Sequence, residues 1–497
     1  MKNKKMVLLI VAVMLVIIAA ASSKYVTSAF LIGQDTNQSQ NPPIQTPVDT
    51  PTSVDKPDVK PIEQPAETDK DVVYISASKL NVREDAVKDG KVLDSLMKGT
   101  AVNIKQEKTD EANIIWYNVG YESAKGEVNG WIVAEHTVKD RTELMDESLR
   151  NLDFTPQDKT FSYPNNPRVE VKGIYLTLYS ASGARLDKLI EMSKRTKINT
   201  FVIDVKDDNG NMLFATEAAE KHNPEANKKA PVKDIKALMQ KLKDNGIYTI
   251  ARIVSFKDPS YAKLHPQKAI VYKDSGKPFT NSDGLIWVSA HDRELWEYNL
   301  EVSKEAAAAG FNEIQFDYVR FPASNGGKLD KILDYRNEKG ESKPETIQNY
   351  LKYAHEQLSP MQVYISADIY GLVGSVSDDM ALGQYWEAVS NVVDYVSPMM
   401  YPSHYANGTY GLSVPDAFPY ETILYGTRDA VNRNKNIETP ATIRPWIQDF
   451  TAGWVKGHIK YGTTQLEQQI KALDENGVKE YLLWNAGNTY SEGALLK

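Results

Sequence analysis

The 497-residue chain contains no cysteine. This absence excludes disulfides, thiolate metal ligands, cysteine nucleophiles and a lipoprotein anchor. Its seven histidines are scattered without paired ligand spacing, so the sequence predicts no metal site and no cofactor. The net charge is −8 and no basic stretch follows the first few residues, which argues against nucleic acid as a partner.

The N-terminus carries an export pattern. Three lysines within the first five residues precede an uninterrupted apolar run over residues 6–21. That run is slightly short for a membrane span of about 20 residues, and the three alanines at its end offer a cleavage site. We therefore expect residues 1–30 to be a signal peptide or a retained membrane anchor, which would be the only membrane contact. The rest of the chain would be extracellular or at the cell surface.

Composition divides the remainder. Residues 31–70 hold seven prolines and almost no large apolar side chain, which predicts an extended linker. Residues 71–140 contain short alternating strands separated by turns, which predicts a small all-β barrel. We expect a second linker over 141–168 and a larger domain over 169–497.

The larger domain alternates apolar strands with helices. The expected strands are 171–177, 200–206, 248–254, 313–319, 363–369, 395–401, 442–448 and 480–486. The expected helices between them are 186–197, 232–245, 294–309, 346–358 and 466–476, and several precede a glycine that suits a C-terminal cap. This order predicts a parallel (β/α)₈ TIM barrel. A doubly wound sheet is the rival, but residues 176–185 match its glycine-rich phosphate loop poorly.

Polar and aromatic residues gather at the expected strand ends. In such a barrel the functional groups collect at the C-terminal ends of the strands. The candidates in chain order are Asp204, Lys206, Arg252, Asp317, Arg320, Asp368, Tyr401, His404, Arg444, Trp446, Trp484 and Asn485.

Two interpretations of these residues remain open. Each aspartate could be one half of a buried ion pair, Asp317 with Arg252 or Arg320 and Asp204 with Lys206. Taken together, paired carboxylates flanked by aromatic rings suit glycosidic chemistry, in which one carboxyl group protonates the leaving oxygen and the other attacks or activates water.

The segment 71–140 resembles the bacterial SH3-like domain. The supporting pieces are the LNVR opening at 80–83, the KGT turn at 98–100, the WYNV strand at 116–119 and the GWI close at 130–132. The resemblance implies a module that binds peptidoglycan or another wall polymer. A barrel that only spaces the domains is the simpler alternative.

The barrel segment resembles the bacterial "putative glycosyl hydrolase" domain family, whose barrels are distantly similar to amylase-like and galactosidase-like hydrolases. The supporting pieces are GIYLT (173–177), NTFVIDVKDDNG (199–210), EIQFDYVRFP (313–322), SADIYG (366–371), YVSPMMYPSHY (395–405) and RPWIQDF (444–450). The resemblance implies a nucleophile where Asp317 ends the fourth strand. Asp368 takes the fifth-strand place, where amylase-like enzymes carry glutamate. The sixth strand ends in Met-Tyr-Pro without a carboxylate, unlike the galactosidase pattern.

These observations lead to one hypothesis and two alternatives. The hypothesis is an exported, cell-wall-associated glycoside hydrolase that cleaves a polysaccharide, with Asp317 and Asp368 catalytic and the other ten candidates around the substrate. The first alternative is a non-catalytic glycan-binding protein on a degenerate barrel. The second is metal-dependent deacetylation of a polysaccharide, which inhibition by a chelator would support.

Overall fold

The computed structural model describes residues 72–77, 79–97, 100–123, 126–139 and 141–497. The described chain divides into two compact units, and the boundary along the sequence lies between Arg150 and Asn151. The expected signal segment and the first linker lie outside the described residues. Within the described part, no helix is both long and apolar enough to cross a membrane.

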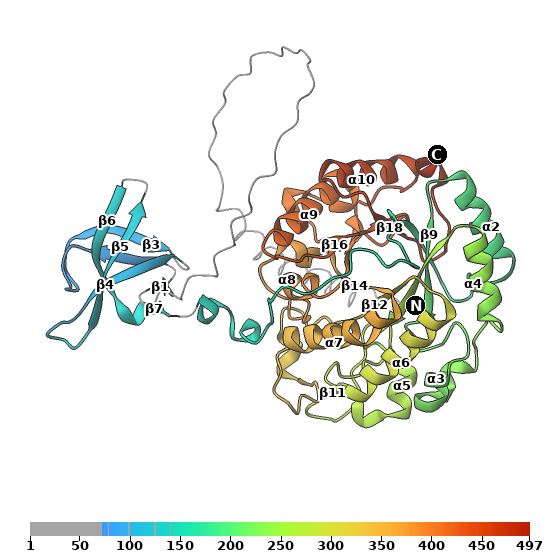
Figure 1. Cartoon of the computed structure of the whole chain (residues 1–497), viewed down its shortest axis with the longest axis horizontal. Coiled ribbons are helices and arrows are strands. Elements are labelled where there is room, and N and C mark those ends of the chain that lie inside the picture. Colours follow the sequence, from blue (N-terminus) through green and yellow to red (C-terminus); the bar gives the residue numbers. More distant parts are fainter. Residues whose placement is uncertain (1–71, 78, 98–99, 124–125, 140) are drawn as a thin grey trace, which may run out of the picture. The chain divides into compact units, whose positions relative to one another are not determined.

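The first unit is an antiparallel β domain. Its sheet, drawn in blue to cyan in Figure 1, has the strand order β3-β2-β6-β5-β4-β1-β7. Along β2 the side chains alternate, so that Leu80 and Val82 enter a core shared with Val119 and Ile132. The prediction of an all-β domain is confirmed. The strands are β1 Val72–Ile75, β2 Lys79–Arg83, β3 Val92–Met97, β4 Ala101–Thr109, β5 Ile115–Ser123, β6 Gly126–Val133 and β7 Thr137–Val138.

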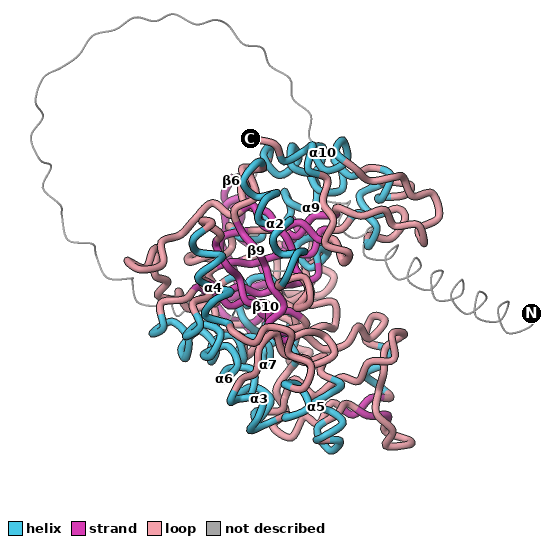
Figure 2. Tube along the Cα trace, turned by 90° about the vertical axis from the view of Figure 1, so that its right-hand side faces the viewer, coloured by secondary structure: helices cyan, strands magenta, loops and turns pink. Residues whose placement is uncertain are grey.

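The second unit is the expected TIM barrel. Its strands pair in parallel in the order β14-β12-β10-β9-β8-β18-β17-β15, and a β14–β15 pairing closes the ring. Figures 1 and 2 show the strands inside a layer of helices. The expected strand 442–448 is split in two, because Pro445 has no N–H to donate to the ladder. The strands of the barrel sheet are β8 Lys172–Leu176, β9 Thr200–Lys206, β10 Tyr248–Val254, β12 Glu313–Asp317, β14 Tyr364–Tyr370, β15 Tyr395–Met400, β16 Thr442–Ile443, β17 Trp446–Gln448 and β18 Tyr481–Trp484, and β11 Val271–Tyr272 and β13 Leu333–Asp334 form a separate antiparallel pair.

Local signals fix where the helices begin and end. The Asp292 side chain caps the start of α6, and Gly310 ends it with a left-handed φ of 112°. Ser342 and Glu345 form a reciprocal capping box at the start of α7. The helices are α2 Gly183–Arg195, α3 Glu217–His222, α4 Ile235–Asp244, α5 Pro259–Leu264, α6 Arg293–Ala309, α7 Lys343–Leu358, α8 Trp386–Ser390, α9 Pro419–Asn434 and α10 Thr463–Glu475.

The barrel unit has two cores. The larger core, between strands and helices, is mostly aliphatic with some aromatic rings, whereas seven of the eleven residues of the core inside the ring are aromatic. The inner core is therefore built from rings, several of which carry hydroxyl or indole N–H groups. Its members are Tyr163, Val171, Tyr175, Val202, Tyr248, Ile250, Tyr364, Tyr395, Tyr401, Trp446 and Leu482.

Residues 151–170, which we call the floor segment, cover the N-terminal end of the barrel. The Tyr364 hydroxyl donates to the Asn166 carbonyl (2.8 Å), and the Asn166 side-chain amide donates to the Asn312 carbonyl (2.7 Å). Arg168 lies 3.3 Å from Asp394 and stacks on Tyr395, with its guanidinium carbon 4.8 Å from the ring centroid. The expected linker over 141–168 thus extends too far, because residues from 151 onward pack with the barrel.

Candidate active site

Arg252 on β10 lies at the centre of a buried charge cluster. Its Nε and Nη2 donate to Asp317 Oδ2 on β12 at 2.9 and 2.5 Å, and its Nη1 donates to Asp204 Oδ1 on β9. All three residues are at most 5% exposed. Asp317 therefore pairs with Arg252 and not with Arg320, and Asp204 pairs with Arg252 and not with Lys206.

The Asp204 carboxyl is held from its other side by Tyr175 on β8. The Tyr175 hydroxyl donates to Asp204 Oδ2 at 2.6 Å, and the Tyr175 ring stacks on Trp484 at 4.2 Å between centroids. Burial raises the pKa of Asp204 to about 6, against the opposing effect of the Arg252 charge. Asp204 can therefore change protonation state near neutral pH.

Asp368 on β14 carries a buried carboxyl group with one hydrogen-bond donor beside it. The residue is 1% exposed, and Trp446 Nε1 donates to its Oδ1 at 2.7 Å. Its Oδ2 is buried and has no hydrogen-bond partner among the described residues. Burial, and next the negative charge of Asp317, raise the pKa of Asp368 well above its usual range. Its environment therefore favours the protonated form.

The backbone after Asp317 is bent to fix this carboxylate. Tyr318 has a left-handed φ of 48°, which is rare for a bulky residue. In that conformation the Tyr318 N–H donates to Asp317 Oδ1 at 2.5 Å, and the strand ends. The Ser255 N–H donates to the Asp317 carbonyl at 2.8 Å. The strained turn thus orients the oxygen that Arg252 leaves free.

Aromatic rings lead from these carboxyl groups to the surface. Tyr401 lies 6.3 Å from Trp484 and 5.3 Å from His404, measured between ring centroids. Burial, and next the charges of Asp368 and Asp317, raise the pKa of Tyr401 well above its usual range. Phe450 lies 6.1 Å from Tyr401 and stacks on Trp454 at 6.0 Å with 19° between the planes, and Trp454 is 63% exposed. We call the five ring-bearing residues the aromatic path: Trp484, Tyr401, His404, Phe450 and Trp454.

Phe450 and Trp454 were not among the sequence candidates. Phe450 lies two residues after the end of β17 within the RPWIQDF motif, and Trp454 lies in the loop that follows. Both follow a strand end, and an exposed tryptophan in a loop could have been chosen on that ground.

Lys206 does not face the barrel mouth, which corrects the prediction. A register shift in the β9–β10 pairing places Arg252 opposite Asp204 but Ile253 opposite Lys206. This bulge breaks the alternation of side chains, so Lys206 points outward toward α6. There it pairs with Asp258 at 2.8 Å and donates to Asn299 at 2.7 Å.

Arg444 is also away from the mouth. It pairs with Glu313, the first residue of β12, and with Glu480, which precedes β18, both at 2.8 Å. Its guanidinium carbon lies 3.6 Å from the Tyr395 ring centroid. Arg444 therefore belongs to the N-terminal layer of the barrel, and its role there is structural.

The last candidate, Asn485, supports a loop at the mouth. Its side-chain amide donates to the Asp449 carbonyl at 2.6 Å, and its oxygen accepts from the Gly487 N–H at 2.8 Å. Among the sequence candidates, the structure thus brings Asp204, Arg252, Asp317, Asp368, Trp446, Trp484 and Tyr401 together. His404 lies further out along the aromatic path.

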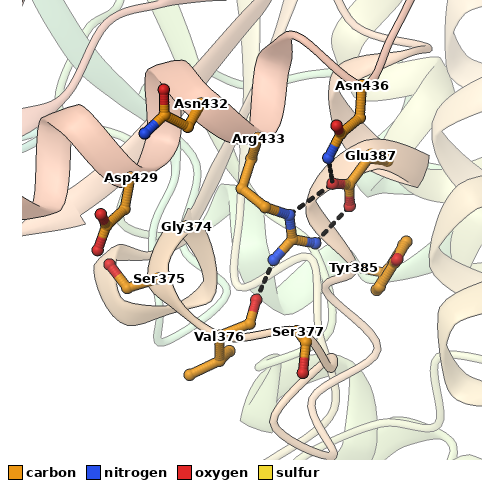
Figure 3. Close-up of a pocket in the computed structure, with 10 residues that line it drawn as sticks. All are labelled: Gly374, Ser375, Val376, Ser377, Tyr385, Glu387, Asp429, Asn432, Arg433 and Asn436. Carbon is orange, nitrogen blue, oxygen red and sulfur yellow. Dashed lines mark hydrogen bonds and ion pairs between the residues drawn. The ribbon is translucent and has the colours of Figure 1, made fainter. Parts of the chain in front are cut away.

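A separate surface hollow of about 460 Å³ lies between the loop at 374–377 and α9 (Figure 3). Arg433 donates to both oxygens of Glu387 and to the Val376 carbonyl, and Asn436 donates to Glu387 at 3.0 Å. These polar groups therefore bond to one another on one side of the hollow. Within the described residues, no three His, Asp or Glu side chains are grouped to hold a metal ion.

Comparisons with solved structures gave similarities of low TM-score. A hypothetical protein from Ruminiclostridium thermocellum is 33% identical over 39% of this chain and 96% of that one, with a TM-score of 0.34. The glycoside hydrolase domain of PgaB (BpsB) from Bordetella bronchiseptica is 13% identical over 65% and 95%, with a TM-score of 0.47. The α-galactosidase TtGalA from Thermus thermophilus is 10% identical over 84% of each chain, with a TM-score of 0.41.

The match to a family model is more extensive. No curated protein matched the chain. The family described as "Putative glycosyl hydrolase domain" matches residues 173–490, which span the barrel from β8 to the loop beyond β18. The match covers more than half of the chain, and the chain therefore belongs to this glycosyl hydrolase family.

Proposed function

We propose that the barrel hydrolyses glycosidic bonds in a polysaccharide, with Asp368 as general acid and base and Asp317 as nucleophile or charge stabiliser. One observation carries the proposal. A buried carboxyl group with a raised pKa lies in the same barrel mouth as a carboxylate that an arginine holds in an ion pair. Two carboxyl groups whose environments differ in this way can divide the roles of acid and nucleophile.

The proton moves as follows in this mechanism. Asp368 gives its proton to the glycosidic oxygen as the bond to the anomeric carbon breaks. Asp317 attacks the anomeric carbon or stabilises the positive charge that develops there. Asp368, now a carboxylate, then takes a proton from the water that completes hydrolysis. Arg252 holds Asp317 in place through their ion pair, and Trp446 orients Asp368.

The aromatic path supports a polymeric substrate. Sugar rings present C–H faces that stack on flat aromatic side chains, and a path from Trp484 to the exposed Trp454 offers several such surfaces. A monosaccharide glycoside would need only the innermost rings. We therefore place a chain of sugars along this path.

Export and wall association complete the proposal. The N-terminal pattern of lysines and apolar residues favours export. The β domain carries the motifs of the SH3-like resemblance, and it would bind a wall polymer while the barrel binds its substrate. Two attachments on one chain raise the effective concentration of the barrel at the wall.

The test measures release of reducing ends from peptidoglycan, secondary wall polymers and a panel of exopolysaccharides. Wild type is compared with Asp317→Asn and Asp368→Asn, and with Asp187→Asn as a surface control whose side chain is 57% exposed. We expect both catalytic variants to lose about 100-fold or more of the rate with binding retained. Binding without release in every protein would mean that the barrel holds glycan without cutting it. A product that lacks acetyl groups, and that no longer forms when a chelator is added, would support deacetylation.

A further inference from the structure

Arg320 differs from the other buried basic residues of the chain. Five lysine or arginine residues in the described part are less than 9% exposed: Lys206, Arg252, Lys257, Arg320 and Arg444. Four of them have a carboxylate within 4 Å. Arg320 is 6% exposed, yet no described carboxylate lies within that distance of it. A buried cation without a counter-ion is costly, so its retention needs a physical reason.

Three aromatic rings hold the Arg320 charge in place. Its guanidinium carbon lies 4.7 Å from the Trp287 ring centroid, 5.2 Å from Tyr318 and 4.8 Å from Tyr370. Aromatic faces stabilise a cation but do not accept the in-plane N–H bonds of a guanidinium. Among the described contacts, one bond uses those donors, from Nη1 to the Phe321 carbonyl at 2.9 Å. Most of the five N–H donors therefore remain for a ligand.

The position of Arg320 connects it to the proposed active site. It follows Asp317 by three residues, and Tyr318 lies between them with one face toward Arg320. Lys257 approaches the same ring at 4.6 Å, although its charge is offset by Asp208 and Asp283. Tyr318 follows β12 and Tyr370 ends β14, which places both rings at the C-terminal end of the barrel.

We propose that Arg320 binds a negatively charged group of the substrate, so that the substrate is an acidic polysaccharide. A planar guanidinium with free N–H donors suits the paired oxygens of a carboxylate or a phosphate. The group would be the carboxylate of an acidic sugar or a phosphate ester on the polymer. This inference rests on the proposed function, because it assigns a substrate class to the same site.

The experiment compares charged polymers with their neutral derivatives. One pair is a uronic-acid polysaccharide before and after reduction of its carboxylates to alcohols. The other pair is a phosphate-bearing wall polymer before and after removal of its phosphates. Wild type, Arg320→Gln, Arg320→Lys and the exposed-site control Arg428→Gln are assayed for kcat/KM on all four, and thermal midpoints confirm that each variant folds.

We expect wild type to prefer one charged polymer over its neutral form by about 10- to 100-fold, the range of a charge-assisted bond. The pair that shows the preference identifies the anion. Arg320→Gln removes the preference, Arg320→Lys keeps part of it, and Arg428→Gln keeps all of it. Equal rates on charged and neutral polymers in wild type would overturn the inference, as would a preference that survives Arg320→Gln.

Affinity electrophoresis in gels containing each polymer separates the two proposals. If the neutral polymers are cut without preference, the hydrolase function stands and the anion subsite fails. If nothing is cut but an anionic polymer retards wild type and not Arg320→Gln, the subsite stands and the hydrolase function fails. If wild type and Arg320→Gln are retarded equally and neither cuts any polymer, both proposals are refuted.

Discussion

Replacing Arg252 with methionine would leave two buried carboxylates without their cation. Arg252 donates three hydrogen bonds to Asp204 and Asp317, and these two residues are 3% and 5% exposed. Methionine keeps much of the side-chain volume but none of the donors. The variant therefore tests the ion pairs more than the packing.

The expected loss of stability depends on pH. Breaking a buried ion pair costs about 3–5 kcal/mol, because it leaves an unpaired charge. The carboxyl groups avoid this cost by taking up protons, and the free energy of protonation is more favourable at pH 5 than at pH 8. Each pH unit above the unfolded-state pKa adds about 1.36 kcal/mol to keeping a carboxyl protonated. Without Arg252 the folded-state pKa of Asp204, already about 6, rises further, so stability falls as pH increases through that range.

Urea unfolding at pH 5 and pH 8 gives the measurement. Six of the eight tryptophans lie in the barrel unit, so fluorescence mainly follows its unfolding. We expect the deficit of Arg252→Met relative to wild type to grow by about 3 kcal/mol between the two pH values, with an unchanged m-value. Arg428→Met, at a side chain that is 57% exposed, should show a deficit within about 0.5 kcal/mol at both. A deficit for Arg252→Met that is the same at pH 5 and pH 8 would refute the assignment of these charges.

Three further predictions follow from the same geometry. The proton of Asp368 is lost as pH rises through its raised pKa, so activity should fall on the alkaline side; Trp446→Phe removes the bond that lowers this pKa and should move the limb to higher pH in a kcat profile. Lys206→Met should lower the urea midpoint by an amount equivalent to about 3 kcal/mol and leave KM unchanged, because Lys206 pairs with Asp258 on the outer side of the strands. A raised KM would contradict this placement. Trp454→Ala should lower kcat/KM on a polymer about tenfold and leave a short aryl glycoside unaffected, and equal losses on both would count against stacking.

The sequence predicted the barrel because each strand and most helices carried their own signals. Apolar runs of strand length alternated with helical stretches, and Gly246, Gly310 and Gly477 end helices with positive φ as expected. Helix α9 was missed. Its interior contains Gly426, which weakens a helical pattern. A Cβ at that position would lie 3.3 Å from the Tyr410 hydroxyl and 3.4 Å from the Tyr405 hydroxyl, so tertiary packing explains the residue.

The site was predicted in part for a related reason. Parallel strands carry their C-terminal ends to one rim, which brings Asp204, Arg252, Asp317 and Asp368 together without detailed knowledge of the register. Lys206 required that knowledge, because one bulge in β9 reverses its direction. Arg444 lies between β16 and β17, just before Pro445. Only the structure shows that it pairs with Glu313 at the N-terminal end of the barrel.

The floor segment also sets an order for assembly during synthesis. Gln157 donates its N–H to the Thr439 hydroxyl, a partner made 282 residues later. At about 5–20 residues per second, the ribosome needs roughly 15–60 s to bridge that separation. The segment can contact Asn312 and Tyr364 earlier, but until then it lacks its contact with Thr439 and its cover of the ring is incomplete. The first part of this unit to be synthesised is thus among the last to complete its native contacts, which makes a nascent chain halted near β14 a natural client for a chaperone.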